Sequence, residues 1–218
     1  FSSIAQRADI FVEDKDLAVE FQCSPISFER LKQRTNGYQI DGKKVVWILG
    51  EKYFAKKLFL EDIAKFARFQ NNVGFYLLYY LVKTKTFCLR YQINEGYGKI
   101  QYSTKYFNSL YKLRDFLKNT KKSSKLQPVK FEPGKIIEQL WRIQLSITKG
   151  QPTHIDLVTE CYEKGRVLVG CPVFCHENCS QKLPIFKGSI LNWRVFLTLQ
   201  IFETNRKFIP DSTLNTIY

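Results

Sequence analysis

The sequence has no apolar run long enough to cross a membrane as a helix. Its longest, GFYLLYYLV at residues 74–82, is nine residues, against the roughly 20 that a spanning helix needs. Internal repeats and low-complexity tracts are also absent, and 44% of the residues are hydrophobic, which is typical of a globular chain rather than a disordered one. A chain of 218 residues accommodates one or two domains with a sizeable core.

Acidic residues are scarce in one segment. Residues 83–125 contain eleven basic residues but only Glu95 and Asp115 as acids, a net charge of +9, whereas residues 1–50 are neutral, with seven of each sign. A positive field of this size on one segment favours a polyanion, either nucleic acid or an anionic membrane. The ordinary alternative is a lysine-rich solubilising surface. We favour nucleic acid because tyrosines are interleaved with the cations, and tyrosine rings stack on unpaired bases.

Particular side chains follow from this expectation. In the basic segment, we expect five lysines to follow a nucleic-acid backbone. Three arginines nearer the N-terminus are further candidates for phosphate contacts, and a solvated helix face is the alternative for the two that lie on a predicted helix. The predicted nucleic-acid-binding residues are Arg7, Arg30, Arg34, Lys99, Lys105, Lys121, Lys122 and Lys125.

The sequence has six cysteines, but a chain of this length does not need disulfides to stabilise it. We therefore expect reduced thiols and a cytoplasmic protein. One cluster, GCPVFCHENC at 170–179, holds thiolate and imidazole groups that suit Zn²⁺, namely Cys171, Cys175, His176 and Cys179. All four lie within nine residues, whereas structural zinc sites bring two separated pairs together. We therefore favour buried thiols over a zinc site.

Periodicity predicts the order of the elements. Residues 8–12 and 17–22 alternate as a hairpin, a helix follows over 27–38, and KKVVWILG ends a β-β-α-β unit at Gly50. Polar TKKSSKLQP is a linker candidate. Further along the chain we expect helices over 58–69, 108–119, 134–147, 152–164 and 189–203, and strands within 73–107. The predicted division is 1–57, 58–125 (basic and aromatic-rich) and 126–218 (helical).

The hairpin predicts its own register. A turn centred on Asp14 and Lys15 makes partner numbers sum to 29, so that Asp9 faces Glu20. One face then carries Ile10, Val12, Leu17, Val19 and Phe21, which we expect to be the buried face. The opposite face carries Arg7, Asp9, Phe11, Ala18, Glu20 and Gln22.

Two carboxylates directly opposite each other destabilise a sheet unless something positive lies between them. A divalent cation such as Mg²⁺ or Mn²⁺ is one such group, because Mg²⁺ is commonly held by one or two carboxylates together with water and phosphate. Gln22 lies two residues after Glu20, where it would position water. The spacing is also compatible with an ordinary solvated hairpin face, so the metal site at Asp9 and Glu20 is a hypothesis.

The stretches QRADI, AVEFQCSPIS, RLKQRTNGY and KVVWILG, together spanning residues 6–50, resemble the nuclease-like segment of the competence protein CoiA family. A weaker resemblance runs through ECYEKGRVL and CPVFCH. The family is similar to the PD-(D/E)xK nucleases. The resemblance implies an α/β, restriction-endonuclease-like mixed sheet, incomplete at its N-terminus, with a mainly helical C-terminal region.

Carried over position by position, the resemblance implies a metal-binding Asp9, the acidic Glu20, and Gln22 in place of the usual lysine. It implies a Mg²⁺-dependent deoxyribonuclease in natural competence, acting with recombination proteins on single-stranded or branched DNA. Because Gln22 replaces a cation, the alternative is a non-catalytic DNA-binding factor on a nuclease scaffold. A pure protein-interaction domain would leave the +9 segment unexplained.

Overall fold

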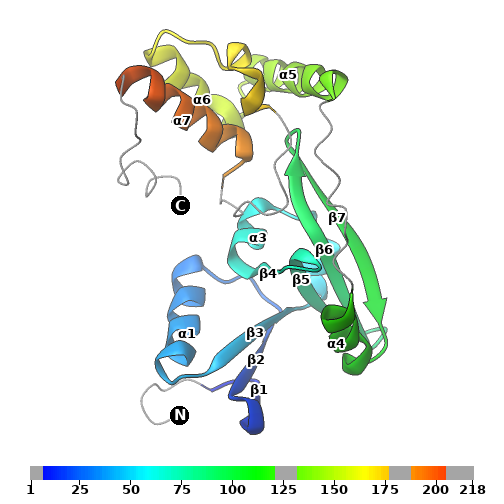
Figure 1. Ribbon diagram of the computed structural model, residues 1–218. Helices are drawn as coiled ribbons and strands as arrows, with labels where there is room; N and C mark the ends of the chain where they lie inside the picture. Colours follow the sequence, from blue (N-terminus) through cyan, green and yellow to red (C-terminus); the bar gives the residue numbers. More distant parts are fainter. Residues whose placement is uncertain (1–6, 121–131, 177–187, 205–218) are drawn as a thin grey trace. The chain divides into compact units, whose positions relative to one another are not determined.

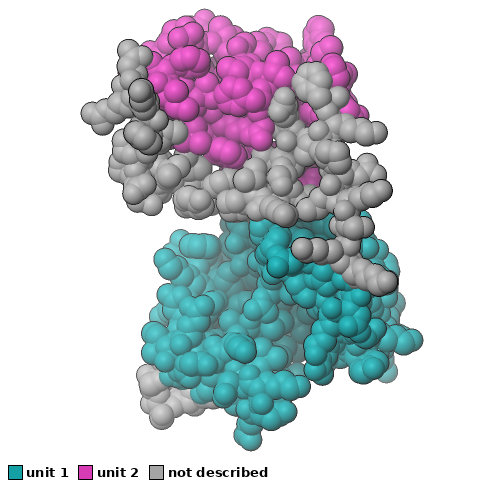
Figure 2. Space-filling model, in the orientation of Figure 1, with its two compact units in different colours: residues 1–93, 102–124 teal, residues 94–101, 125–218 magenta. Residues whose placement is uncertain are grey.

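The computed structural model describes residues 7–120, 132–176 and 188–204, which form two compact units. Unit 1 comprises residues 1–93 and 102–124, and unit 2 comprises residues 94–101 and 125–218 (Figure 2). In the described part of the chain, no helix is both long and apolar enough to cross a membrane. The division into three segments at 57 and 125 remains a prediction.

Unit 1 is built on a mixed sheet with the order β1-β2-β3-β5-β6-β7, and β4 adds to β5 (Figure 1). β2 and β3 are parallel, as are β3 and β5, whereas β1 and β6 run antiparallel to their neighbours β2 and β5. The strands are β1 (Ile10–Val12), β2 (Leu17–Gln22), β3 (Lys44–Leu49), β4 (Arg68–Gln70), β5 (Gly74–Leu81), β6 (Thr86–Gly96) and β7 (Lys99–Phe107). The α/β class expected from the sequence is therefore confirmed, as is the helical C-terminal region.

Helices cover the two faces of this sheet unequally. On one face, α1 places Tyr38 against Ala18 and Val45 in a buried cluster. On the other, α4 places Leu113 against Leu89 and Phe107. The described helices of unit 1 are α1 (Phe28–Ile40), α2 (Glu51–Ala55), α3 (Leu60–Phe66) and α4 (Leu110–Asn119). The short elements α2 and β4 were not predicted.

The hairpin register is confirmed, because Ile10 pairs with Val19 and Val12 with Leu17. The turn is a short 3-10 helix, Glu13–Lys15, closed by Asp16 in the left-handed region at φ 46°.

The expected direction of burial was wrong. Ala18 and Glu20 are the buried residues of β2, whereas Ile10 is 50% exposed and the rest of the apolar set is only half-buried. The reason is tertiary: α1 crosses over the face that carries Ala18 and Glu20, so that face becomes the interior.

The carboxyl ends of β2 and β3 are held close together. The Gly50 backbone N–H donates to the Gln22 carbonyl at 2.9 Å. A Cβ at Gly50 would meet Cys23 Sγ at 2.9 Å and Cys23 Cα at 3.3 Å, so Cys23 would have to shift to make room for it. This close approach fixes where Gln22 lies.

Unit 2 consists of helices and the tip of the β6–β7 hairpin. Its core joins Ile143, Leu157, Cys161 and Val195, contributed by three helices. On α5, Ile136 and Ile143 are buried and lie seven residues apart on one side of the helix. The helices are α5 (Pro133–Thr148), α6 (Pro152–Glu163) and α7 (Ile190–Thr204), close to the predicted 134–147, 152–164 and 189–203.

A buried carboxylate ties the hairpin tip to α7. Glu95 is 9% exposed, and its Oε2 accepts a hydrogen bond from the Ile190 backbone N–H at 2.9 Å. Burial raises the pKa of Glu95 above its usual value, although the hydrogen bond and the charge of Arg194 oppose the rise. A carboxyl with a raised folded-state pKa contributes stability below its unfolded pKa and loses that contribution as pH rises through the folded pKa.

We therefore expect Glu95→Gln to reduce the loss of stability as pH rises from about 4.5, because the amide oxygen still accepts from Ile190 but carries no charge. Urea denaturation at a series of pH values measures this. Glu163→Gln, at an exposed position, is the control and should follow the parent. A parallel pH dependence in parent and Glu95→Gln would contradict the expectation.

Candidate functional site

Glu20 is a buried carboxylate held by two side chains of α1. It is 4% exposed, and its Oε1 accepts hydrogen bonds from the Tyr38 hydroxyl and from Arg34 Nη2, the latter at 2.5 Å. Arg34 and Tyr38 are four residues apart, so both project from the same side of the helix. Because an isolated buried carboxylate is costly, these two contacts explain how Glu20 remains under α1.

Arg34 also connects the helix to the start of β1. Its Nη2 donates to the Arg7 carbonyl at 3.4 Å. Burial by itself lowers the pKa of Arg34, but the hydrogen bond and charge of Glu20, with smaller contributions from Tyr38 and Asp9, raise it above the ordinary value. The positive group beside Glu20, close enough to interact with Asp9, is therefore Arg34.

Asp9 lies at the edge of the hairpin, one residue before β1. Extending the register by one step pairs it with Glu20. Its side chain bends along the edge, and Oδ2 accepts a hydrogen bond from the Phe21 backbone N–H at 2.8 Å. Asp9 and Glu20 thus belong to the same hairpin, but Asp9 is exposed whereas Glu20 is buried.

Gln22 ends β2 on the same face as Glu20. Its Nε2 donates to the Ser24 carbonyl at 2.5 Å. Among the described contacts, one side-chain oxygen of each of three residues takes no hydrogen bond: Asp9 Oδ1, Glu20 Oε2 and Gln22 Oε1. Two carboxylate oxygens and one amide oxygen form the donor set that a hard cation such as Mg²⁺ accepts, with water and phosphate completing its shell.

The same residues do not form a complete metal cage. Within the described ranges, no three His, Cys, Asp or Glu side chains come together as a metal-binding group. The donor set at β1 and β2 is therefore limited to two carboxylates, which is the number that Mg²⁺ commonly takes from a protein when a phosphate supplies further oxygens. By donor chemistry, the residues present fit such an ion.

The other predicted cations fall in different places. Arg7 and Arg30 are exposed near the site, and Lys105 is exposed on β7. Lys99 forms an ion pair with Glu138 of α5 at 2.7 Å, within unit 2. Lys121, Lys122 and Lys125 lie outside the described residues.

The cysteine cluster lies in unit 2. Cys175 and His176 are buried, Cys171 is half-buried and Cys179 lies outside the described residues. Burial, together with the neighbouring Cys161 and Cys175 thiols, raises the pKa of Cys171 to about 12, so this thiol stays protonated at neutral pH. Cys161 of α6 is a member that the sequence analysis missed, since nothing in the spacing signals it.

Tyr38 is a residue of the candidate site that the sequence analysis did not single out. Its position on the apolar stripe of the helix predicts a core residue, and the ring is indeed 3% exposed. The hydroxyl, however, reaches Glu20. The available signal was the spacing Arg34-x-x-x-Tyr38 on the helix that follows the strand with Glu20.

A mixed sheet with a helix closing over a carboxylate, and a second carboxylate one residue before the adjoining strand, is consistent with a nuclease-like α/β domain. The sequence matches the family model described as "Competence protein CoiA, nuclease-like domain" over residues 1–123. That is more than half of the chain, and the chain belongs to the CoiA competence-protein family. No curated protein and no solved structure matches it significantly.

Tyr38→Phe is expected to lower the free energy of unfolding by about 1–3 kcal/mol, because it deletes a donor to a buried carboxylate while keeping the packed ring. Chemical denaturation of the full chain measures the change. Tyr162→Phe on α6, where the side chain is 75% exposed, serves as the control with an expected change below about 0.5 kcal/mol. Equal losses in the two variants, or none in Tyr38→Phe, would contradict the assigned hydrogen bond.

Proposed function

We propose that this chain is a metal-dependent, nuclease-like competence protein that hydrolyses phosphodiester bonds in DNA, with Asp9 and Glu20 as ligands of Mg²⁺ or Mn²⁺. The observation that carries the proposal is how the polar side-chain atoms of three residues are used. One atom of Asp9, Glu20 and Gln22 is fixed by a protein hydrogen bond, and one oxygen is left. Hydrogen bonds of this kind hold the ligating side chains in position before an ion binds.

Each residue of the site has a distinct task in this account. Tyr38 and Arg34 hold Glu20 by Oε1, so that Oε2 is the oxygen available to a metal ion. The Phe21 backbone N–H holds Asp9 by Oδ2 in the same way, leaving Oδ1. A bound divalent cation would supply charge stabilisation at the phosphate and lower the pKa of an attacking water.

Arg34 has a second task in the proposal. The usual lysine of the related nucleases is replaced by Gln22, so the strand itself supplies no cation. The Arg34 guanidinium, 28% exposed at the side chain, lies beside Glu20 and supplies a fixed positive charge there. Guanidinium groups pair well with phosphate oxygens. Gln22 is proposed to position water through its Oε1.

A non-catalytic DNA-binding factor is the second candidate, and one observation favours it. Glu20 Oε1 already accepts from both Tyr38 and Arg34, so the carboxylate is partly neutralised without a metal ion. In that case the cluster is structural, and it keeps α1 on the sheet of a scaffold that holds DNA. This candidate predicts salt-dependent DNA binding without cleavage.

Cleavage of DNA by the full chain in Mg²⁺ or Mn²⁺ distinguishes the two candidates. We expect Asp9→Ala and Glu20→Gln each to lower the cleavage rate on the order of 100-fold or more, because each removes a ligand of the ion that carries several kcal/mol of transition-state stabilisation. Chelation of the metal should abolish cleavage. Gel electrophoresis of labelled single-stranded and branched DNA provides the measurement.

Asp14→Ala is the matched control, since Asp14 is an exposed carboxylate on the turn of the same hairpin. It should cleave at the parental rate. Equal rates in the parent, Asp9→Ala and Glu20→Gln would refute the assigned ligands. Absence of cleavage by the parent in either metal, with DNA still bound, would establish the non-catalytic candidate instead.

A further inference from the structure

A groove in unit 1 lies between the end of β7 and the start of α4. Its volume is about 580 Å³, within the range of about 300–1,000 Å³ typical of ligand pockets. Its lining combines exposed rings, amino groups and a helix start. The lining residues that bear on its chemistry are Lys105, Tyr106, Tyr111, Lys112, Asp115 and Phe116.

Two tyrosines at the groove are conspicuously exposed. Tyr106 is 56% exposed and Tyr111 is 77% exposed. The Tyr106 ring makes an edge-to-face contact with Phe54 of α2, with ring centroids 6.3 Å apart, on the sheet face opposite α4. Tyr111 projects from the first turn of α4, so it is the ring available beside the groove. A ring left this accessible presents a face on which an unpaired base stacks.

The cations of the groove are not used in ion pairs. Across the described part of the chain, Lys105 and Lys112 form no salt bridge. Lys105 Nζ lies 4.2 Å from the centroid of the Phe116 ring, which holds the ammonium group in place. The one carboxylate of the lining, Asp115, accepts a hydrogen bond from Asn119. The groove therefore carries two ammonium groups against one carboxylate that is already hydrogen-bonded.

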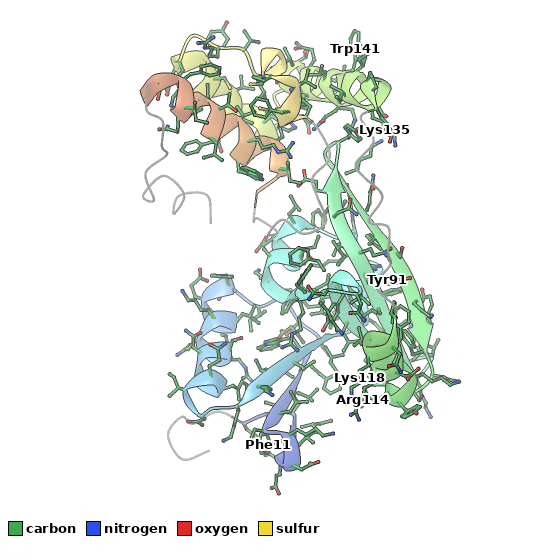
Figure 3. The ribbon with its side chains drawn as sticks, viewed as in Figure 1. Phe11, Tyr91, Arg114, Lys118, Lys135 and Trp141 are labelled. Atoms are coloured by element: carbon green, nitrogen blue, oxygen red, sulfur yellow. The ribbon has the colours of Figure 1, made fainter. Side chains whose placement is uncertain are left out.

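The helix itself adds to the positive field and extends it. α4 is ten residues long, is capped by Ser109, and begins inside the groove, so its N-terminal partial charge adds to that of Lys112. Beyond the groove, Tyr111, Arg114 and Lys118 recur at i, i+3 and i+7, and all three are exposed on one side of α4. Figure 3 labels Arg114 and Lys118 on this helix. Tyr111, Arg114 and Lys118 therefore extend the row of rings and cations from the groove along the helix.

From these observations we infer that the groove between β7 and α4 binds a segment of single-stranded DNA, with a base on Tyr111 and backbone phosphates along Lys105, Lys112, Arg114 and Lys118. The inference rests on the proposed function in that DNA is taken as the ligand. It adds a second surface, because α4 packs on the sheet face opposite α1 and Glu20.

The chemistry of base stacking favours single-stranded over duplex DNA. Stacking on a tyrosine requires a base face that is not already covered by its neighbour, which single strands offer and intact duplex does not. An anionic membrane would also attract the cations, so vesicles of anionic phospholipid are included in the test.

The test is the affinity of the full chain for a fluorescent oligothymidylate of about twelve nucleotides, measured by anisotropy in a salt series. We expect Tyr111→Ala to weaken binding at least about five-fold, since stacking of one base is worth about 1 kcal/mol or more. Tyr111→Phe keeps the ring and should bind within about two-fold of the parent. Lys112→Ala should reduce the slope of log affinity against log salt by about 0.7.

Matched controls come from elsewhere in the chain. Lys52→Ala on α2 and Tyr162→Ala on α6 remove an exposed lysine and an exposed tyrosine, and both should bind like the parent. The measurements are made in EDTA, so that no divalent cation is held at Asp9 and Glu20 and no cleavage occurs. The binding result at the groove is therefore independent of whether Asp9 and Glu20 support cleavage.

Three outcomes would overturn the inference. One is unchanged affinity in Tyr111→Ala and Lys112→Ala. Another is a loss of affinity in Lys52→Ala as large as that in Lys112→Ala, because the effect would then depend only on the net charge of the protein. The third is preference for duplex DNA of the same length, or for vesicles of anionic phospholipid over the oligonucleotide, because both lack the free base face that Tyr111 requires.

Discussion

The carboxylate of Glu20 lies under a helix, and the local structure around it serves to keep a negative charge in that position. Tyr38 and Arg34 reach it from α1, and Trp47 lies next to it across the parallel pair of β2 and β3. A carboxylate without partners in this position would cost several kcal/mol of desolvation. The position of α1 on the sheet and the charge state of the site are therefore linked.

This constraint explains why the hairpin presents its polar face inward. The face with Ala18 and Glu20 is covered because the helix that follows β2 crosses over it, and Glu20 is tolerated there only with its two partners. The apolar face of β1 and β2 is left half-buried as a consequence. Under the proposed function this arrangement has a use, because a carboxylate held by hydrogen bonds presents its remaining oxygen in a fixed position.

Much of the fold follows from periodicity, and its limits are physical. The alternation over 10–22 predicts the register, because a slip of one residue changes the face of every side chain. It does not predict which face a later helix covers, since that depends on contacts distant in sequence. α2 and β4 are five and three residues long, too short for a period to be recognised. Element types for α5, α6 and α7 were predictable because apolar residues recur along each of them.

The sequence predicts the two acidic residues of the candidate site, but not the side chains that contact Glu20. Asp9 and Glu20 follow from the register, whereas Arg34 was expected to face phosphate and Tyr38 the core. Both meet one carboxylate oxygen. Spacing places two side chains on one side of a helix, but it gives no information about what lies opposite them. The groove beside α4 was only partly foreseen, because the sequence indicates a basic aromatic segment and not the order in which rings and cations line a surface.

If Asp9 and Glu20 jointly hold a divalent cation, as proposed, that ion can be located directly. Crystals of the full chain soaked in Mn²⁺ should give an anomalous density peak bounded by Asp9 Oδ1 and Glu20 Oε2, with the contacts of Tyr38 and Arg34 to Glu20 Oε1 preserved. The peak should vanish in Asp9→Asn and remain in Asp14→Asn. A parent crystal with the Glu20 contacts intact and no peak at these two oxygens, at Mn²⁺ concentrations that support cleavage, would contradict the account.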